Sequence, residues 1–245
     1  MPPITDNAVC IRHWDFSETS QTVSLFTRQH GILRGLAKGA KREKGDFSGG
    51  IDVLTRGQVV AIVKPGRDLA TLTQWTLLEV YRAARSSLAA NRAGLYMADL
   101  VHQMVREADA HPQLFDDFCH CLTALEDADG VDEALLRFQW AILKEGGYEP
   151  EVRLNAGTGQ PLTKASTFAF SARAGGIVPD TGEADRWRVR RETVTLLQSL
   201  ADGTPPEPAV NDAVVIGRAN HLLASYIREI LGSEPPAMRW AFPSK

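Results

Sequence analysis

The strongest constraint on the fold is a change of residue pattern near position 80. Before it, five short runs rich in β-branched and aromatic residues are separated by turn-forming pairs such as Gly49-Gly50 and Pro65-Gly66. These predicted strands lie near residues 7–14, 21–28, 31–38, 51–63 and 69–80. From about Tyr81 the apolar residues recur with the 3.6-residue period of helices. The chain is therefore predicted to be α+β, with a small barrel over 1–80 and a helical domain over 81–245.

Five strands in about eighty residues suit a small closed barrel. The five-stranded OB-fold is a common barrel of this kind that binds nucleic acid. Periodicity alone does not separate an OB-fold from an SH3-like barrel. Either barrel would be followed by a helical bundle, in which a segment of irregular pattern at about 148–187 is inserted between helices.

A basic hairpin is the clearest candidate site. The stretch 22–47, TVSLFTRQHGILRGLAKGAKREKGDF, reads as two strands that meet at His30-Gly31 and then continue into a glycine-spaced basic tract. No acidic residue lies between Glu18 and Glu43. A mobile cationic loop is suited to a polyanion such as a nucleic-acid backbone, although a solvated surface loop has the same composition.

The net charge of −3 disfavours a nucleic-acid binder, but its distribution does not. Residues 1–80 carry ten Lys or Arg against eight Asp or Glu, which gives +2, and residues 81–245 carry seventeen against twenty-two, which gives −5. The basic character is thus local to the predicted barrel. Trp75 lies there beside Thr71 and Thr73 on one strand face, so it is either a core residue or a platform on which a base stacks.

Sequence signatures of catalysis are missing. There is no G-x-x-x-x-G-K-[ST] loop for nucleotide phosphates, no G-x-S-x-G elbow and no H-E-x-x-H motif. Cys119 and Cys121 fall within a helical stripe, where side chains two residues apart point about 200° apart and cannot share a metal ion. We expect no catalytic residue, no metal and no cofactor, and therefore a non-enzymatic protein.

The chain has neither a signal-peptide layout at its N-terminus nor a long uninterrupted apolar run. Its three cysteines cannot all pair, which favours reduced thiols. These features predict a cytoplasmic protein without membrane contact.

Three blocks of the sequence resemble the RecO family of recombination mediator proteins. The first is Leu25-Phe26-Thr27-Arg28, then Gly31, then AKGAKR at 37–42; the second is LRFQWAILKEGGYEP at 136–150; the third is NHLLASYIREILG at 220–232. They occur in the family's order and span most of the chain. The resemblance implies an N-terminal OB-fold, which resolves the choice between the two barrels.

The resemblance also implies a function in DNA repair. Such a protein binds single- and double-stranded DNA, anneals strands, works with RecR and single-stranded-DNA-binding protein, and helps to load RecA at gaps, so it would be associated with the nucleoid. The residues expected to contact phosphates are the cations of the predicted barrel: Arg28, Arg34, Lys38, Lys41, Arg42 and Lys44, with Arg56, Lys64 and Arg67 as weaker candidates.

Many members of the family hold a zinc ion with two cysteine pairs in the segment after G-Y-x-P. This chain keeps the surrounding glycines but has Asn155, Thr158, Pro179 and Gly182 where the ligands would lie, and no cysteine after Cys121. Structural zinc needs four Cys or His ligands, so we expect none here. The segment should instead be held by packing, with Tyr148, Phe168 and Phe170 as the candidate residues.

Two other functions fit the composition. One is an RNA-directed OB-fold accessory factor, and the other is an adaptor whose acidic helical half dominates and whose affinity for nucleic acid is weak. The resemblance favours the recombination mediator, and these two functions remain the alternatives.

Overall fold

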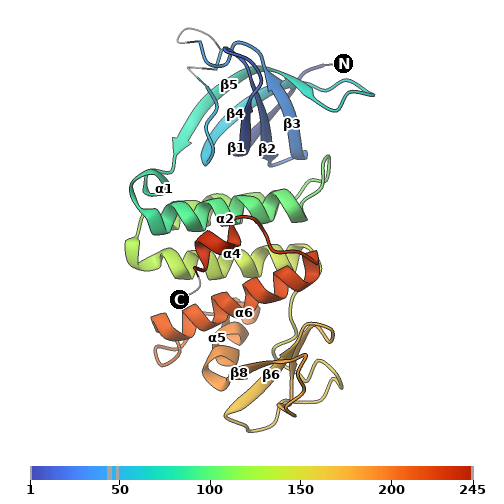
Figure 1. Ribbon diagram of the computed structural model, residues 1–245, viewed down its shortest axis with the longest axis vertical. Coiled ribbons are helices and arrows are strands. Elements are labelled where there is room, and N and C mark those ends of the chain that lie inside the picture. Colours follow the sequence, from blue (N-terminus) through green and yellow to red (C-terminus); the bar gives the residue numbers. More distant parts are fainter. Residues whose placement is uncertain (1, 43–45, 48–49, 244–245) are drawn as a thin grey trace.

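The computed structural model describes residues 2–42, 46–47 and 50–243. Figure 1 shows an elongated molecule with a β-barrel at one end, a layer of helices in the middle and a small β-sheet at the other end. The predicted order of barrel and helices is confirmed.

The barrel closes through the strand order β1-β2-β3-β5-β4. Its strands are β1 (Ile4–Asp15), β2 (Gln21–Thr27), β3 (Gly31–Ala37), β4 (Thr55–Ile62) and β5 (Ala70–Val80). Neighbouring strands are antiparallel except β3 and β5, which pair in parallel over Gly35–Ala37 and Ala70–Leu72. This arrangement agrees with the predicted OB-fold barrel.

The first two strands serve two cores at once. Because side chains alternate along a strand, Cys10 and Leu25 point into the barrel while Ile11 and Phe26 belong to the core formed with the helices. Phe26 packs against Phe115 and Phe118, with ring centroids 5.5 and 6.1 Å apart. The barrel is thus packed on the helices through a continuous apolar core rather than joined to them by a linker alone.

The helical half begins immediately after β5. Its helices are α1 (Ala83–Ser86), α2 (Leu88–Met104), α3 (Pro112–Ala124), the short 3₁₀ helix η1 (Ala128–Gly130), α4 (Val131–Glu145), α5 (Arg191–Asp202), α6 (Ala213–Leu231) and α7 (Met238–Ala241). Asp212 caps the N-terminus of α6 by accepting from two backbone amides, and Gly232 ends it in the left-handed conformation. None of the helices in the described part of the chain combines the length and the apolar character needed to cross a membrane.

The β2–β3 turn is built to touch the helical half. Thr27 Oγ1 donates to the Gly31 carbonyl at 2.8 Å, and Ile32 N–H donates to the Arg106 carbonyl at 3.3 Å. Gly31 has a φ of +63°, and a Cβ placed there would lie 2.2 Å from the Asp109 carbonyl oxygen. Only glycine allows both this backbone conformation and this approach.

The segment predicted to be irregular contains a sheet. Its strands β6 (Thr167–Ser171), β7 (Gly176–Val178) and β8 (Trp187–Arg190) pair antiparallel in the order β7-β6-β8. The strands are only three to five residues long, too short for their periodicity to be recognised in the sequence. The rest of 148–187 is turns and extended chain, as expected.

Packing of this sheet depends on Phe170. Its buried ring stacks on Trp187 at 5.8 Å and meets the edge of Tyr226 on α6 at 5.0 Å. Phe168 is buried as well, so the expectation for both phenylalanines is confirmed. The expectation for Tyr148 was wrong, because its side chain is 47% exposed and lies beyond the end of α4 rather than in the small sheet.

Hydrogen bonds shape the two turns at which the family's zinc ligands would lie. Asn155 Oδ1 accepts from Gly157 N–H at 2.9 Å, and Asp180 Oδ1 accepts from Gly182 N–H at 3.4 Å. Such side-chain bonds to nearby backbone stabilise turns without a metal. The described residues contain no cluster of three or more His, Cys, Asp or Glu placed to hold an ion. The residues present therefore do not fit a zinc site.

Replacing Gly31 by alanine should destabilise the protein more than replacing Gly66 by alanine. Both glycines have a positive φ, but nothing lies within 4 Å of a Cβ built on Gly66. Gly66→Ala therefore incurs only the conformational cost, roughly 1–2 kcal/mol, and Gly31→Ala adds the clash with Asp109. Urea unfolding of the two variants measures the difference, and equal losses would show that the approach of the turn to the helical half is unimportant.

Phe170→Ala should lower the free energy of unfolding by about 3–5 kcal/mol, because it removes a fully buried aromatic ring from the small sheet. The matched control is Tyr148→Ala, whose exposed ring should change stability by no more than about 0.5 kcal/mol. Denaturant titration of both variants checks the expectation, which fails if the two values are similar.

Chelators should leave the melting temperature of the protein unchanged, and elemental analysis should find no stoichiometric zinc. A structural zinc ion contributes directly to folding, so its removal would lower the melting temperature. About one zinc per chain would contradict the replacement of the metal by packing and turn hydrogen bonds.

Candidate nucleic-acid interface

The predicted basic hairpin divides into two parts in the structure. The β2–β3 turn faces the helical half, whereas the tract after β3 lies at the end of the barrel away from the helices (Figure 1). The cations of the hairpin therefore lie in different surroundings and have different partners.

Arg28 holds the barrel against α3. Its Nε and Nη2 donate to the two carboxylate oxygens of Asp116 at 2.9 and 2.7 Å. These hydrogen bonds lower the pKa of Asp116 below its usual value. A bidentate pair of this kind uses the guanidinium fork that would otherwise grip a phosphate. Arg28 thus acts in docking the barrel, a role that sequence reasoning missed.

Arg34 and Lys41 also have acidic partners. Arg34 Nη1 lies 3.5 Å from Glu107 Oε1 on the loop between α2 and α3, and Lys41 Nζ lies 2.6 Å from Asp15 Oδ1 at the end of β1. The hydrogen bond from Lys41 lowers the pKa of Asp15. Both pairs are partly exposed, so a polyanion could compete with the carboxylates.

Four exposed cations form no ion pair within the described parts of the chain. Two lie in the loop after β3 and two in the turn between β4 and β5: Lys38, Arg42, Lys64 and Arg67. Figure 1 shows the β4–β5 hairpin reaching out sideways from the barrel, away from the tract that follows β3. Lys44, which the sequence also suggested, lies outside the described residues.

We call residues 38–42 the cation loop. Its backbone is fastened to the turn between β1 and β2, because Gly39 N–H donates to Ser20 Oγ at 3.2 Å and Lys41 N–H donates to the Thr19 carbonyl at 3.1 Å. Lys38 and Arg42 are therefore presented from an anchored loop next to the end of β1. Anchoring reduces the entropy that the loop loses when it binds a ligand.

Arg56 is only partly exposed, unlike Lys38 and Arg42. It is half-buried near Tyr81 and Cys119, and its Nε has no hydrogen-bond partner within the described residues. Burial raises the pKa values of both Tyr81 and Cys119. The β4 strand turns the side chain of Arg56 toward the junction with the helices, and its weak assignment to the interface stays a prediction.

Trp75 is not a stacking platform. Only 2% of the residue is exposed, and it belongs to the barrel core. Gly57 on the adjacent strand makes room for the indole, because a Cβ there would lie 2.6 Å from two ring atoms. The neighbouring threonines on β5 are exposed, which is why the sequence pattern suggested an exposed strand face. In the closed barrel, however, Trp75 points into the core.

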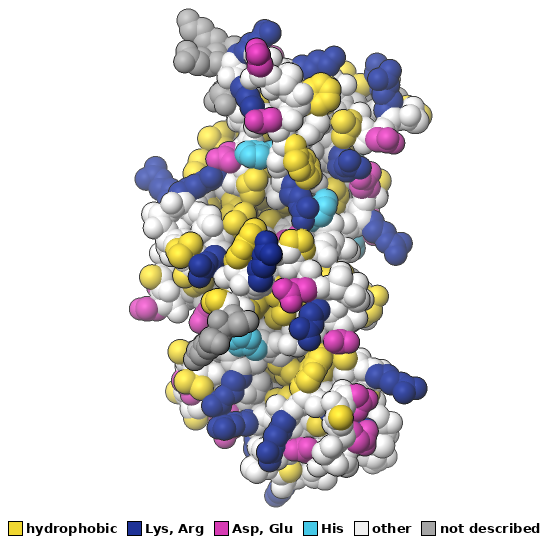
Figure 2. Space-filling view, viewed as in Figure 1, with side chains coloured by type: hydrophobic (Ala, Val, Ile, Leu, Met, Phe, Trp, Pro, Cys, Tyr) yellow, Lys and Arg dark blue, Asp and Glu magenta, His cyan; other side chains and the backbone are white. Residues whose placement is uncertain are grey.

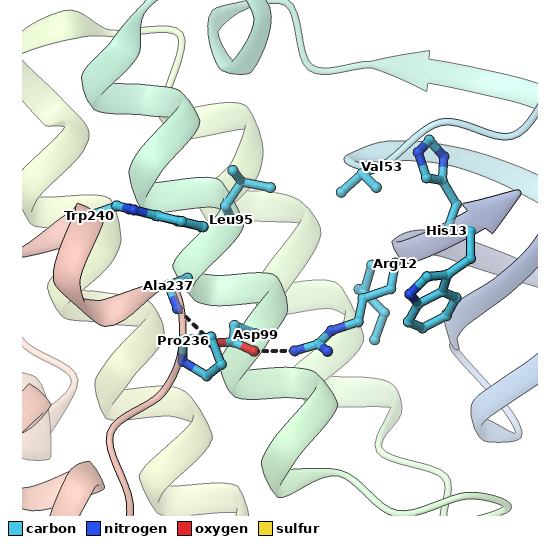
Figure 3. A pocket seen from close by; sticks show the side chains of 10 residues that line it. Arg12, His13, Val53, Leu95, Asp99, Pro236, Ala237 and Trp240 are labelled. Atoms are coloured by element: carbon cyan, nitrogen blue, oxygen red, sulfur yellow. Dashed lines mark hydrogen bonds and ion pairs between the residues drawn. The ribbon is translucent and has the colours of Figure 1, made fainter.

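Two other tryptophans are accessible instead. Trp14 at the end of β1 is 48% exposed, and Trp240 in α7 is 46% exposed. Both line a cleft where β1, α2 and the C-terminal segment meet (Figure 3). Sequence reasoning did not select Trp14, although its polar neighbours His13 and Asp15 are a signal that the strand end is exposed.

The cysteines show no sign of reactivity. Cys10, Cys119 and Cys121 are free and buried. Burial raises the pKa of Cys121 to about 12, so its thiol stays protonated at neutral pH. Cys119 and Cys121 are small residues of the hydrophobic core that the helices form.

Comparisons with known proteins agree with this architecture. Family models described as the N-terminal and the C-terminal part of recombination protein O match residues 1–81 and 85–239. The DNA repair protein RecO of Rhodopirellula baltica is 35% identical over 210 residues, which cover 84% of this chain and 78% of the relative. RecO of Salinibacter ruber is 31% identical over 187 residues, covering 75% and 70%, and that of Idiomarina loihiensis is 26% identical over 245 residues, covering 98% and 97%.

The two family models together match nearly the whole chain, in the order of the barrel and the helical half. The resemblance found in the sequence is therefore confirmed, and with it a role in DNA repair and recombination. This chain belongs to the RecO family.

Proposed function

We propose that this protein is a DNA-binding recombination mediator. It binds single- and double-stranded DNA, anneals complementary strands and, together with RecR and single-stranded-DNA-binding protein, helps to load RecA at gaps. It would act in the cytoplasm, at the nucleoid. Family membership supports the general role, and the exposed cations of the barrel support the DNA contact.

The observation that carries the proposal is the cation loop. Lys38 and Arg42 extend from an anchored loop at the free end of the barrel, with no carboxylate within 4.0 Å among the described residues. Figure 2 shows further Lys and Arg side chains projecting from this end of the molecule. When Lys38 and Arg42 bind DNA phosphates, counterions are released from the DNA. No carboxylate of the described residues has to be displaced from these two cations first.

Annealing requires no catalytic group. The protein must lower the repulsion between two phosphate backbones and hold the strands near each other long enough to pair. Lys64 and Arg67 lie on a different side of the barrel from the cation loop, so the two groups of cations can face separate strands (Figure 1). The protein would act as a basic scaffold rather than as an enzyme.

Replacing Lys38 and Arg42 by alanine should weaken binding to every DNA sequence. The slope of log affinity against log salt should fall by about 1.4 on single strands and about 1.8 on duplex, because each lost phosphate contact contributes about 0.7 or 0.9. Fluorescence anisotropy over a series of salt concentrations measures the slope.

The matched control removes two cations from the same hairpin, in Arg28→Ala/Arg34→Ala. Since both arginines already face carboxylates, this variant should change the salt slope less than Lys38→Ala/Arg42→Ala. Equal slopes for the wild type and Lys38→Ala/Arg42→Ala, with normal melting, would show that the cation loop is not the DNA site.

Annealing should proceed without ATP, and the purified protein should not hydrolyse it, because the chain lacks a nucleotide-binding loop. Strand pairing followed by fluorescence quenching, with and without ATP, tests this directly. An ATPase activity that a substitution in this chain abolishes would refute the non-enzymatic role.

The two other functions predict different behaviour. An RNA-directed factor would bind an RNA strand more tightly than a DNA strand of the same sequence, and an adaptor would show little salt-dependent binding even at low ionic strength. Competition between the two strands at low salt therefore distinguishes all three.

A further inference from the structure

A cleft of about 310 Å³ opens where the barrel meets the helical half. Its walls come from β1, α2 and the C-terminal segment, three parts of the chain that are distant in sequence (Figure 3). A cavity of this size falls within the range of small-ligand pockets. No residue of the cation loop lines this cleft.

Asp99 fixes the geometry of the cleft. This buried carboxylate on α2 accepts from the Arg12 guanidinium of β1 and, at 3.0 Å, from the backbone N–H of Ala237 (Figure 3). One side chain therefore ties together all three walls. The charge of Asp99 is balanced by Arg12, so the base of the cleft is close to neutral.

The cleft exposes two indole rings. Trp14 and Trp240 are about half-exposed, whereas Trp75 and Trp140 are buried and Trp187 stacks on Phe170. Aliphatic side chains, including Val53 and Leu95, complete the walls (Figure 3). Exposed tryptophans beside an apolar cavity are suited to flat, partly apolar ligands.

Acidic and basic side chains both lie around the rings, but the nearby carboxylates of Asp15 and Asp52 are paired with Lys41 and Arg85. The Arg239 guanidinium lies over the Trp240 ring at 5.0 Å, and Arg92 precedes Leu95 by three residues, so it lies on the same face of α2. Neither arginine forms an ion pair within the described part of the chain. Figure 2 shows hydrophobic surface bordered by basic and histidine side chains at the level where the barrel meets the helices.

On the barrel side, the cleft ends one residue from a contact of the cation loop. Trp14 immediately precedes Asp15, which pairs with Lys41 of that loop. A strand bound by Lys38 and Arg42 would therefore reach Trp14 within a short distance. A peptide ligand would not explain the combination of two indoles with arginines that form no ion pair among the described residues.

We infer that this cleft binds unpaired nucleotides of single-stranded DNA, whose bases stack on Trp14 and Trp240 and whose phosphates lie near Arg92 and Arg239. Stacking on aromatic rings tolerates every base, and arginine adds to it through its own contact with the π system. The inference rests on the proposed function and deepens it, because it gives the protein a site that duplex DNA cannot use. In a duplex the bases are stacked on one another and cannot reach the rings.

The test is the double variant Trp14→Ala/Trp240→Ala, measured with labelled oligothymidylate and with a duplex of equal length. Its affinity for the single strand should fall about tenfold or more, since each base stack contributes a factor of that order. Duplex affinity should stay within about twofold, and the salt slope on both ligands should be unchanged, because no charge is removed. Oligothymidylate should also quench the intrinsic tryptophan fluorescence of the wild type more than that of the double variant.

Two controls separate stacking from a general loss of structure. Tyr148→Ala removes an aromatic ring that is equally exposed, at 47%, but lies away from the cleft, so it should leave affinity unchanged. Trp14→Phe/Trp240→Phe keeps a ring at each position and should recover most of the lost affinity. Melting curves of all variants show whether each one is folded.

The outcomes are distinct. If the wild type binds both DNA forms and the folded double alanine variant binds the single strand equally well, the cleft is not a stacking site and the proposed function stands. Tighter binding of an RNA strand of the same sequence would overturn the assignment of the ligand as DNA. If the wild type binds neither DNA form, the proposed function itself fails.

Discussion

The packing of Phe26 against Phe115 and Phe118 unites the two halves of this molecule. Because strand side chains alternate, β2 can fill the barrel with Leu25 and at the same time supply Phe26 to the helical core. Burial of such aromatic rings contributes strongly to the packing at this junction. The directional contacts, Arg28 with Asp116 and Gly31 against Asp109, select the orientation in which that burial occurs.

The two parts of the N-terminal signature of the family have different roles in the structure. Its first part, from Phe26 to Gly31, forms a turn that docks on the helical half and is satisfied by internal partners. Its second part, the cation loop, is anchored by its backbone while Lys38 and Arg42 stay in solvent. Two neighbouring basic residues in one motif can therefore serve unrelated purposes. Arg28 stabilises the arrangement of domains, and Lys38 remains available to a polyanion.

The small sheet is held together by side-chain packing and by hydrogen bonds within its turns. Its turns are closed by Asn155 and Asp180, and its interior is filled by Phe170 between Trp187 and Tyr226. A metal supplies a few strong directional bonds at one point, whereas this arrangement spreads the stabilisation over apolar contacts with α6. The segment lies at the end of the molecule opposite the barrel, far from the cation loop (Figure 1).

The sequence by itself determined the order of elements, because the change from period 2 to period 3.6 near Tyr81 reflects local backbone geometry. It also determined the family, because the residues that carry the resemblance, such as Gly31 and Lys38, lie close together in the chain. It did not reveal the short strands β6 to β8, which form only because distant segments pair. Nor did it distinguish a buried Trp75 from an exposed Trp14, or Arg28, which pairs with Asp116, from Lys38, which has no acidic partner among the described residues. Those differences depend on which residues from elsewhere in the chain lie alongside each side chain, and only the closure of the barrel and its docking on the helices decide that.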